Sequence, residues 1–190
     1  MRALSPPLGR TIGPEPNNKD MLIYLDANIV QYCADEEDFI FGNSERCKSA
    51  DPNLRKELVA LRRLVELEQL GDWHFVASPH LMAELHAGKP TRDQRKVYKV
   101  LQEAWNDSGY SEDSRPTEEK MRGIEQSLSM LKLKHAPDQR HLAEAIALNA
   151  SWFLTNDKDV VKKAKGGVGG IRVSPPSECL RDISTGLFLM

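Results

Sequence analysis

Residues 21–26 read MLIYLD, a short apolar run that ends at once in an acid. A continuous apolar run of this length is typical of a strand that is buried on both faces, as in a parallel sheet. Similar short runs recur at residues 73–77, 152–155 and 171–173, with helical segments between them. Strands that alternate with helices predict an α/β protein, a three-layer α/β/α sandwich around a central parallel sheet.

The helices are predicted from the spacing of apolar residues and from the residues that start helices. Between Asn53 and Leu70, apolar residues recur every three or four positions, which is one stripe of an amphipathic helix. Ser78 followed by Pro79 is a helix start, with a hydroxyl cap and a proline in the first turn. The mostly polar residues 31–52 are expected to be irregular or a broken helix. Further helices are expected at residues 91–105, 117–133, 138–149 and 156–165.

Length and composition describe an ordinary globular chain. Its 190 residues carry a formal net charge of −2, from 26 Lys and Arg against 28 Asp and Glu, and 40% of them are hydrophobic. The small net charge excludes a histone-like or polybasic binder, although a local basic rim stays compatible with it. No apolar run reaches the roughly 18 residues that a membrane-spanning helix needs, so no membrane partner is expected.

The cysteines and the two ends of the chain carry further expectations. Cys33, Cys47 and Cys179 are odd in number and have no C-x-x-C spacing, which argues against both a zinc site and a disulfide framework and fits a reducing cytoplasm. Residues 1–20 hold four prolines and no apolar block, so they are expected to be a flexible leader rather than a signal peptide. Residues 184–190 form an unusually apolar tail.

Four acids fall where parallel sheets bind ligands, beyond the carboxyl ends of the strands. Asp26 ends the first strand and Asp157 follows the third, whereas Glu84 and Asp138 lie in helices that leave or approach a strand. Each acid alone has a simpler interpretation, the aspartates as helix caps and Glu84 as a solvated helix residue. Together they predict one site, because like charges at one edge repel unless a cation binds them. An all-oxygen ligand set favours Mg²⁺ or Mn²⁺.

At these residues the chain resembles the PIN-domain family, metal-dependent nucleases that include the VapC-type toxin ribonucleases. The resemblance covers about residues 21–183 and implies a Rossmann-like fold over that range, with a phosphodiesterase site. Its longest block is its most specific part. It rests on LDANIV at residues 25–30, SPHLMAELHAG at 78–88, PDQRHLAEAIALNASWFLTNDKDV at 137–160 and RVSPPSECL at 172–180.

The resemblance also implies roles for individual residues. Asn28 would orient Asp26 or a water molecule, Thr155 would support Asp157, and Asp159 would be a further acid beside them. The implied activity is an endoribonuclease, and the implied partners are an RNA substrate, an antitoxin protein and a second copy of the chain. The residues implied to hold Mg²⁺ or Mn²⁺ and to carry the hydrolysis are Asp26, Glu84, Asp138 and Asp157.

The remaining residues are consistent with metal-assisted hydrolysis, in which a metal-bound water loses its proton near neutral pH. No serine, cysteine or histidine constellation indicates a covalent nucleophile. His141 shares a helix face with Asp138 but is expected to be a surface histidine. Trp105 and Tyr110 either stack on single-stranded bases or pack in the core. Cations expected to contact substrate phosphates, unless they only form solvated helix faces, are Arg92, Lys96 and Lys158.

Other phosphate chemistries fit the sequence less well. A haloacid-dehalogenase-like phosphatase needs Asp-x-Asp after the first strand, where position 28 is Asn. A dinucleotide-binding protein needs G-x-G-x-x-G at the same place, and that motif is absent. The alternative that stays open is a PIN-like module that binds nucleic acid or serves as a scaffold, with little or no catalysis.

Overall fold

The structure, a computed structural model, describes residues 21–68, 73–107 and 116–186. In these residues the strands form one four-stranded sheet, in which every pairing is parallel and the order is β2-β1-β3-β4. The chain is therefore an α/β protein with a central parallel sheet, as the alternation of strands and helices predicts. The strands are β1 (Met21–Leu25), β2 (Trp73–Val76), β3 (Trp152–Leu154) and β4 (Arg172–Ser174).

Helices fill the connections between the strands. The β1–β2 connection contains α1, α2 and α3, and the β2–β3 connection contains α4 to α7 together with a 3₁₀ turn. In the first half of the chain the helices are α1 (Ala27–Asp35), α2 (Glu37–Ile40), α3 (Pro52–Glu68), α4 (Pro79–Ala87) and α5 (Arg92–Asp107). In the second half they are α6 (Glu118–Leu128), the 3₁₀ turn Ser129–Leu131, α7 (Ala136–Ala147), α8 (Lys158–Lys163) and α9 (Pro176–Ser184).

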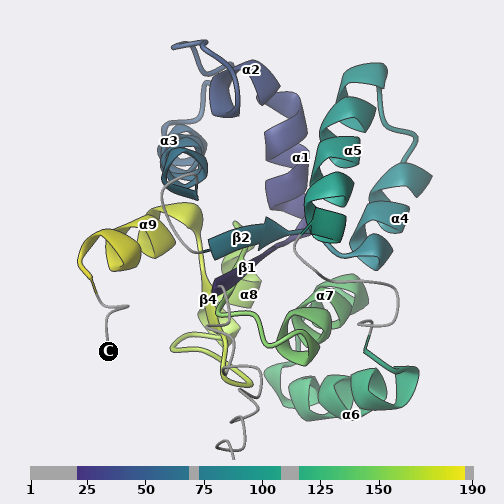
Figure 1. Ribbon diagram of the computed structural model, residues 1–190. Helices are drawn as coiled ribbons and strands as arrows, with labels where there is room; N and C mark the ends of the chain where they lie inside the picture. Colours follow the sequence, from purple (N-terminus) through teal and green to yellow (C-terminus); the bar gives the residue numbers. More distant parts are fainter. Residues whose placement is uncertain (1–20, 69–72, 108–115, 187–190) are drawn as a thin grey trace, which may run out of the picture.

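Helices lie on both sides of the sheet, an arrangement consistent with three layers. Figure 1 shows α3 and α9 packed together on one side and α7, with α6 against it, on the other. The two central strands, β1 and β3, are almost wholly buried: Ile23 and Tyr24 in β1 and all of β3 have less than 1% exposure. This explains why their sequences read as continuous apolar runs rather than as alternating ones.

Each of the four strands is followed directly by a helix at the carboxyl edge of the sheet, and three of these helices, α1, α4 and α8, are capped by a polar side chain there. Asp26 accepts a hydrogen bond from the Ala27 N–H at the start of α1, and Ser78 accepts one from Leu81 in α4. Asp157 accepts two from the first turn of α8. The capping interpretation therefore holds for Asp26 and Asp157. It fails for Asp138, because α7 starts at an N-cap His135 and Asp138 lies within its first turn.

The polar stretch of residues 31–52 is a broken helix followed by an irregular segment, in agreement with its composition. The chain forms α1 and α2 and then has no regular element until α3. Buried Glu36 holds the irregular segment, because its carboxylate accepts the N–H groups of Lys48 and Ser49 at 2.9 and 3.0 Å. A single buried acid thus satisfies backbone donors that no ladder or helix reaches.

The predicted ends of the elements differ from the observed ones by one to three residues at most positions, for example in β2, which ends at Val76 rather than residue 77. The predicted leader (residues 1–20) lies outside the described residues, as do residues 187–190 of the predicted tail. Cys33, Cys47 and Cys179 are free thiols, and all are buried. In the part of the chain that the structure describes, no helix is both long and apolar enough to cross a bilayer.

Candidate functional site

The candidate site is built around Asp26, which is 2% exposed and follows β1 at the carboxyl edge of the sheet. Because β1 and β3 pair Leu25 with Leu154, the residues that follow, Asp26 and Thr155, emerge side by side. The Thr155 hydroxyl donates to Asp26 Oδ2 at 2.6 Å, and the Asn28 side-chain amide donates to the same oxygen at 2.6 Å. Both donors hold the carboxylate in one orientation.

Asn28 and Thr155 also join the two strand ends to each other. The Asn28 amide N–H₂ lies 3.0 Å from Thr155 Oγ1, and its carbonyl oxygen accepts the Asn156 N–H at 3.0 Å. Thr155 Oγ1 accepts the Asp157 N–H at 3.0 Å as well. The separation of two residues between Asp26 and Asn28 therefore places an acid and an amide where the amide can support both the acid and the loop after β3.

Asp157 lies in that loop, with one carboxylate oxygen committed to the backbone. Its Oδ1 accepts the N–H groups of Asp159 and Val160 at 2.7 and 3.2 Å, so Oδ2 is the oxygen left for a ligand. Asp159, the further acid of the predicted set, forms an ion pair with Lys163 at 2.8 Å. The hydrogen bond from Lys163 lowers the pKa of Asp159, so this carboxylate stays charged and turned toward its own helix.

Asp138 is half-buried in the first turn of α7, where the charges of Asp26 and Asp157 repel its carboxylate. Its pKa is raised first by burial and then by repulsion from Asp26 and Asp157, with His135 and His141 acting in the opposite direction. Three acids from different parts of the sequence thus share one electrostatic environment at the carboxyl edge. Their mutual repulsion is the condition in which a cation binds favourably.

His141 corrects the expectation of a surface histidine, because its side chain is 1% exposed and lies between two acids. Its Nδ1 lies 3.3 Å from Asp26 Oδ1, and its Nε2 lies 3.0 Å from Glu84 Oε2. Burial lowers the pKa of His141, but the carboxylates of Asp26, Glu84 and Glu144 outweigh it and raise the pKa above the usual value. The spacing from Asp138 on one helix face was visible in the sequence, whereas burial against β1 was not.

Glu84 is linked to the other acids through His141. Its side chain is 43% exposed, which agrees in part with the simpler interpretation of a solvated helix residue. Among the described residues, the group of three possible metal ligands with atoms all within 4.8 Å of one another is His80, Glu84 and His141. The four predicted acids do not form a second such group in this part of the chain, although three of them share one edge.

A second buried carboxylate, Glu144, lies beside this site and was not predicted. Its Oε2 accepts hydrogen bonds from the Tyr24 hydroxyl at 2.7 Å and the Ser78 hydroxyl at 2.5 Å. Burial, followed by the charge of Glu144, raises the pKa of Tyr24, so the phenol stays protonated and donates. The signal in the sequence was an acid inside the otherwise apolar run from Leu142 to Ala147.

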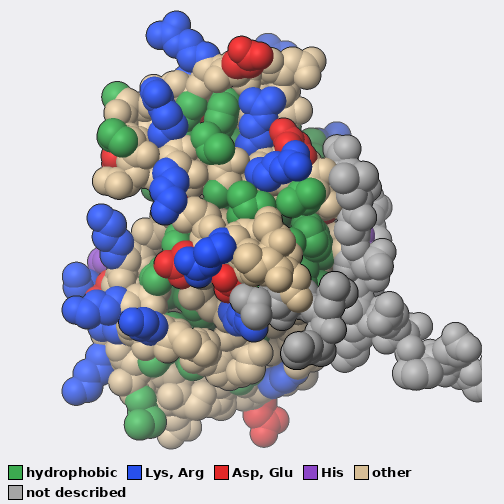
Figure 2. Space-filling view, turned by 90° about the vertical axis from the view of Figure 1, so that its left-hand side faces the viewer, with side chains coloured by type: hydrophobic (Ala, Val, Ile, Leu, Met, Phe, Trp, Pro, Cys, Tyr) green, Lys and Arg blue, Asp and Glu red, His purple; other side chains and the backbone are tan. Residues whose placement is uncertain are grey.

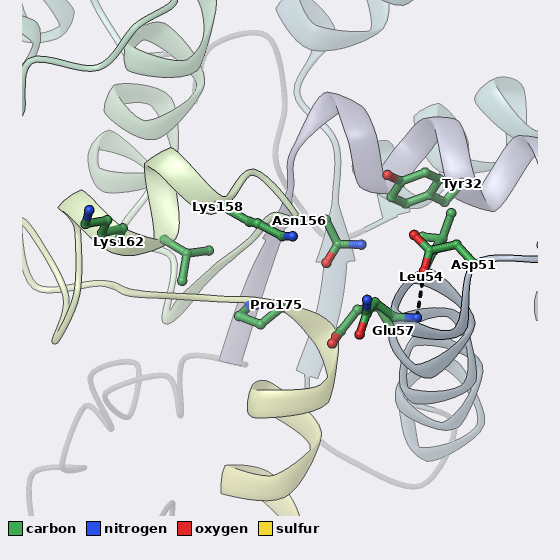
Figure 3. Close-up of a pocket in the computed structure, with 10 residues that line it drawn as sticks. Tyr32, Asp51, Leu54, Glu57, Asn156, Lys158, Lys162 and Pro175 are labelled. Carbon is green, nitrogen blue, oxygen red and sulfur yellow. Dashed lines mark hydrogen bonds between the residues drawn. The ribbon is translucent and has the colours of Figure 1, made fainter.

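A cavity of about 490 Å³ opens beside Asp157, between α3, α8 and the loop after β4. Figure 3 shows Lys158 and Lys162 on one side of it and Asp51, Leu54 and Glu57 on the other. Glu57 is occupied there, because its carboxylate accepts the N–H and the hydroxyl of Ser177 at 2.8 and 2.7 Å. Lys158 and Lys162 are the cations that line this cavity, and Lys158 directly follows Asp157 in the sequence.

The other predicted cations lie farther from the acids. Gln94 in α5 donates to Asp35 at the end of α1, and the nine residues of α1 span roughly 13 Å from the sheet edge. Arg92 and Lys96 share this part of α5, where Lys96 pairs with Asp93 at 2.8 Å. On the face that carries α3 and α9, Lys and Arg side chains are spread out rather than gathered in one patch (Figure 2).

Of the two aromatic residues expected either to stack on bases or to pack in the core, Trp105 is 3% exposed and belongs to the core. Tyr110 lies outside the described residues. Stacking on a nucleobase therefore has no support from Trp105.

Comparison of the chain with protein-family models, curated protein sequences and solved structures finds no match.

Proposed function

We propose that this chain is a metal-dependent phosphodiesterase with a Rossmann-like, PIN-like fold, and that it acts as an endoribonuclease. The observation that carries the proposal is the electrostatic coupling of Asp138 to Asp26 and Asp157 at the carboxyl edge of the parallel sheet. These residues come from three separate segments, and although Asp26 and Asp157 also cap helices, a shared function explains why three acids that repel one another lie at one edge. The D-x-N and T-N-D sequences that resemble the PIN-domain family supply the residues that hold two of them.

The donor set suits a hard divalent cation. Carboxylates with an amide and a hydroxyl beside them, and no thiol, are the groups that Mg²⁺ and Mn²⁺ prefer. When bound, such an ion supplies a water of lowered pKa and neutralises charge on the scissile phosphate. Asp26, Asp138 and Asp157 would hold it, with Glu84 as the fourth acid of the set.

Other residues of the chain would position the metal ligands and bind the substrate. Asn28 and Thr155 hold the Asp26 carboxylate in one orientation, which preorganises the site. Lys158 and Lys162 line the cavity beside Asp157, where they would bind the phosphates of an RNA backbone. Arg92 and Lys96, on the more distant α5, would contact a longer substrate. An antitoxin partner and a homodimer belong to the same proposal, as the resemblance to toxin ribonucleases implies them. A cytoplasmic location is proposed from the cysteine pattern.

A binding or scaffold module is the second candidate, and one observation favours it. Both Asp26 oxygens already have hydrogen-bond partners within the protein, and Glu84 is engaged by His141. A carboxylate with its acceptor positions filled has less to offer an ion. In such a module the cavity lined by Lys158 and Lys162 would still contact nucleic acid, but the acids would not catalyse hydrolysis.

The deciding experiment measures cleavage of labelled RNA and DNA with Mg²⁺, with Mn²⁺ and with EDTA. Asp138→Asn is the informative variant, because Asp138 caps no helix and keeps its shape as Asn. Asp93→Asn is the matched control, since Asp93 also lies in the first turn of a helix but belongs to α5 and not to the proposed set of acids. We expect ion-dependent cleavage of RNA that Asp138→Asn loses and Asp93→Asn keeps.

Two other results would contradict the nuclease. Cleavage that survives in Asp138→Asn, Asp26→Asn and Asp157→Asn would point to a contaminating enzyme. Absence of cleavage on every substrate, with no rise of Tm on addition of either ion, would favour the binding module.

A further inference from the structure

Two histidines and a glutamate meet at the side of the site that faces α4 and α7. His80 and Glu84 are four residues apart on α4 and so share one face of that helix, while His141 comes from α7. Their ligand atoms all lie within 4.8 Å of one another. Two exposed side chains at a spacing of four are common on a helix. The buried His141, which comes from α7, is not part of that helical pattern and completes the group.

The surroundings of His141 prepare it to bind a metal. Both ring nitrogens face carboxylates, which only accept hydrogen bonds: Nδ1 lies 3.3 Å from Asp26 Oδ1, and Nε2 lies 3.0 Å from Glu84 Oε2. A metal bound at Nε2 would take the place of the proton there, while Asp26 would keep the proton on Nδ1. A carboxylate on one ring nitrogen and a metal on the other is the usual arrangement of histidine ligands, because the carboxylate sets the tautomer and the ring orientation.

We propose that His80, Glu84 and His141 form a binding site for a Zn²⁺-class transition-metal ion, separate from the aspartates. Two imidazoles and a carboxylate are ligands that Zn²⁺ and Co²⁺ prefer over Mg²⁺. The expectation that the chain has no zinc site rested on its cysteines, and this group contains none. The site shares Glu84 with the proposed acidic set and contacts Asp26 through His141, so its test measures binding of the ion directly rather than nuclease activity.

Access and coordination number agree with this assignment. His80 is exposed and lines a cavity of about 530 Å³ between α4, α5, α6 and α7. Of the three proposed ligands, His80 lines this cavity, and none of the aspartates does. Three protein ligands leave one position of a tetrahedral ion for water or a ligand in the cavity, which is the pattern of open rather than closed zinc sites.

Cobalt titration of the full-length protein, purified without a histidine tag and freed of metal, tests the proposal. Co²⁺ bound to imidazole nitrogen in a four-coordinate site absorbs visible light, so binding is followed directly and activity plays no part. We expect one equivalent of Co²⁺ to bind, Zn²⁺ to displace it, and a large excess of Mg²⁺ to leave it in place. We expect His80→Ala and Glu84→Gln to weaken binding by more than about tenfold.

The controls separate this site from the proposed nuclease. His86→Ala removes an exposed histidine from the same helix, and Asp138→Asn removes an acid of the proposed Mg²⁺ site; both should bind Co²⁺ like the natural chain. Since His80 is exposed, its variant should fold. Unchanged Co²⁺ absorption in His80→Ala, equal loss in His86→Ala, or displacement by Mg²⁺ would each overturn the site, whatever the result of the cleavage assay.

Discussion

Asp26 and Glu144 are both buried carboxylates on the same side of the sheet, but their neighbours differ in charge. Glu144 accepts from two neutral hydroxyls, those of Tyr24 and Ser78. Asp26 accepts from an amide and a hydroxyl, contacts a histidine, and lies within reach of two further aspartates. Glu144 is therefore a satisfied structural acid, whereas the surroundings of Asp26 leave unresolved repulsion that a cation would relieve.

One face of α7 carries both Glu144 and the histidine that contacts Asp26. Tyr24 and Asp26 are two residues apart in and after β1, so their side chains point to the same face of the sheet. On α7, His141 and Glu144 are three residues apart and also share a face. The two pairs meet, His141 with Asp26 and Glu144 with Tyr24. The contact between β1 and α7 thus contains one structural pair, Glu144 with Tyr24, and one candidate functional pair, His141 with Asp26.

Glu144→Ala is expected to cause the largest loss of stability. It removes the acceptor of the buried Ser78 hydroxyl and leaves the Tyr24 hydroxyl with Ser78 Oγ alone, at 2.9 Å, and each loss costs up to about 1–3 kcal/mol. The free energy of unfolding in urea should fall accordingly, while the cleavage rate of the folded fraction stays unchanged. Loss of cleavage without loss of stability would reverse the contrast between the two carboxylates.

Thr155→Val and Ser78→Ala sharpen the contrast by removing one hydroxyl donor from each acid. Each should cost about 1–3 kcal/mol of stability, because a buried carboxylate loses a donor. Only Thr155→Val should also reduce ion-dependent cleavage, by about 10–100-fold, as outer-shell partners of metal ligands do. Equal effects of the two variants on cleavage would show that the two acids play the same role.

The pH dependence of stability separates the two pairs on α7 in metal-free protein. Because the pKa of His141 is raised in the folded state, its contribution is fully present below its unfolded pKa of about 6.5 and is lost as pH rises through the folded value. Urea unfolding should therefore give a smaller free energy at pH 8.5 than at about pH 6, after a drop that His141→Gln removes. If the drop persists in His141→Gln, another group is responsible.

The smallest expected effect is a gain. Asp138→Asn removes the repulsion by Asp26 and Asp157 and should raise the stability at neutral pH by less than about 1 kcal/mol, since solvent screens a half-exposed group. The gain should vanish in acid, where Asp138 is protonated and resembles Asn. Thermal unfolding at two pH values measures it. A loss of stability would mean that Asp138 has a favourable partner in the fold.

Local sequence patterns predicted most of the fold because its strands are buried on both faces and its helices are amphipathic. The positions of Asp26 and Asp157 followed from the same patterns, since each comes directly after a strand. His141 and Glu144 did not follow, because their burial depends on how α7 packs across β1. A histidine on a helix reads as exposed until the strand opposite it supplies an acid.

The roles of the basic residues also depend on tertiary packing that the sequence does not show. Arg92, Lys96 and Lys158 appear equivalent in the sequence, as charges on predicted helices. Only the arrangement of the helices separates Lys158, beside the loop that carries Asp157, from Arg92 and Lys96 near the far end of α1. Which charges can reach a bound phosphate is a property of tertiary structure.

The position of Tyr24 and Asp26 on one face of the sheet also disfavours a wrong register of β1. A shift of β1 by one residue would turn both side chains toward the opposite face and bring Ile23 and Leu25 against α7. Glu144 would then lose the Tyr24 hydroxyl, and His141 would lose its contact with Asp26. Misaligned chains would thus carry an uncompensated buried charge, which penalises the wrong pairing during folding even though every residue of β1 is bulky enough to fill it.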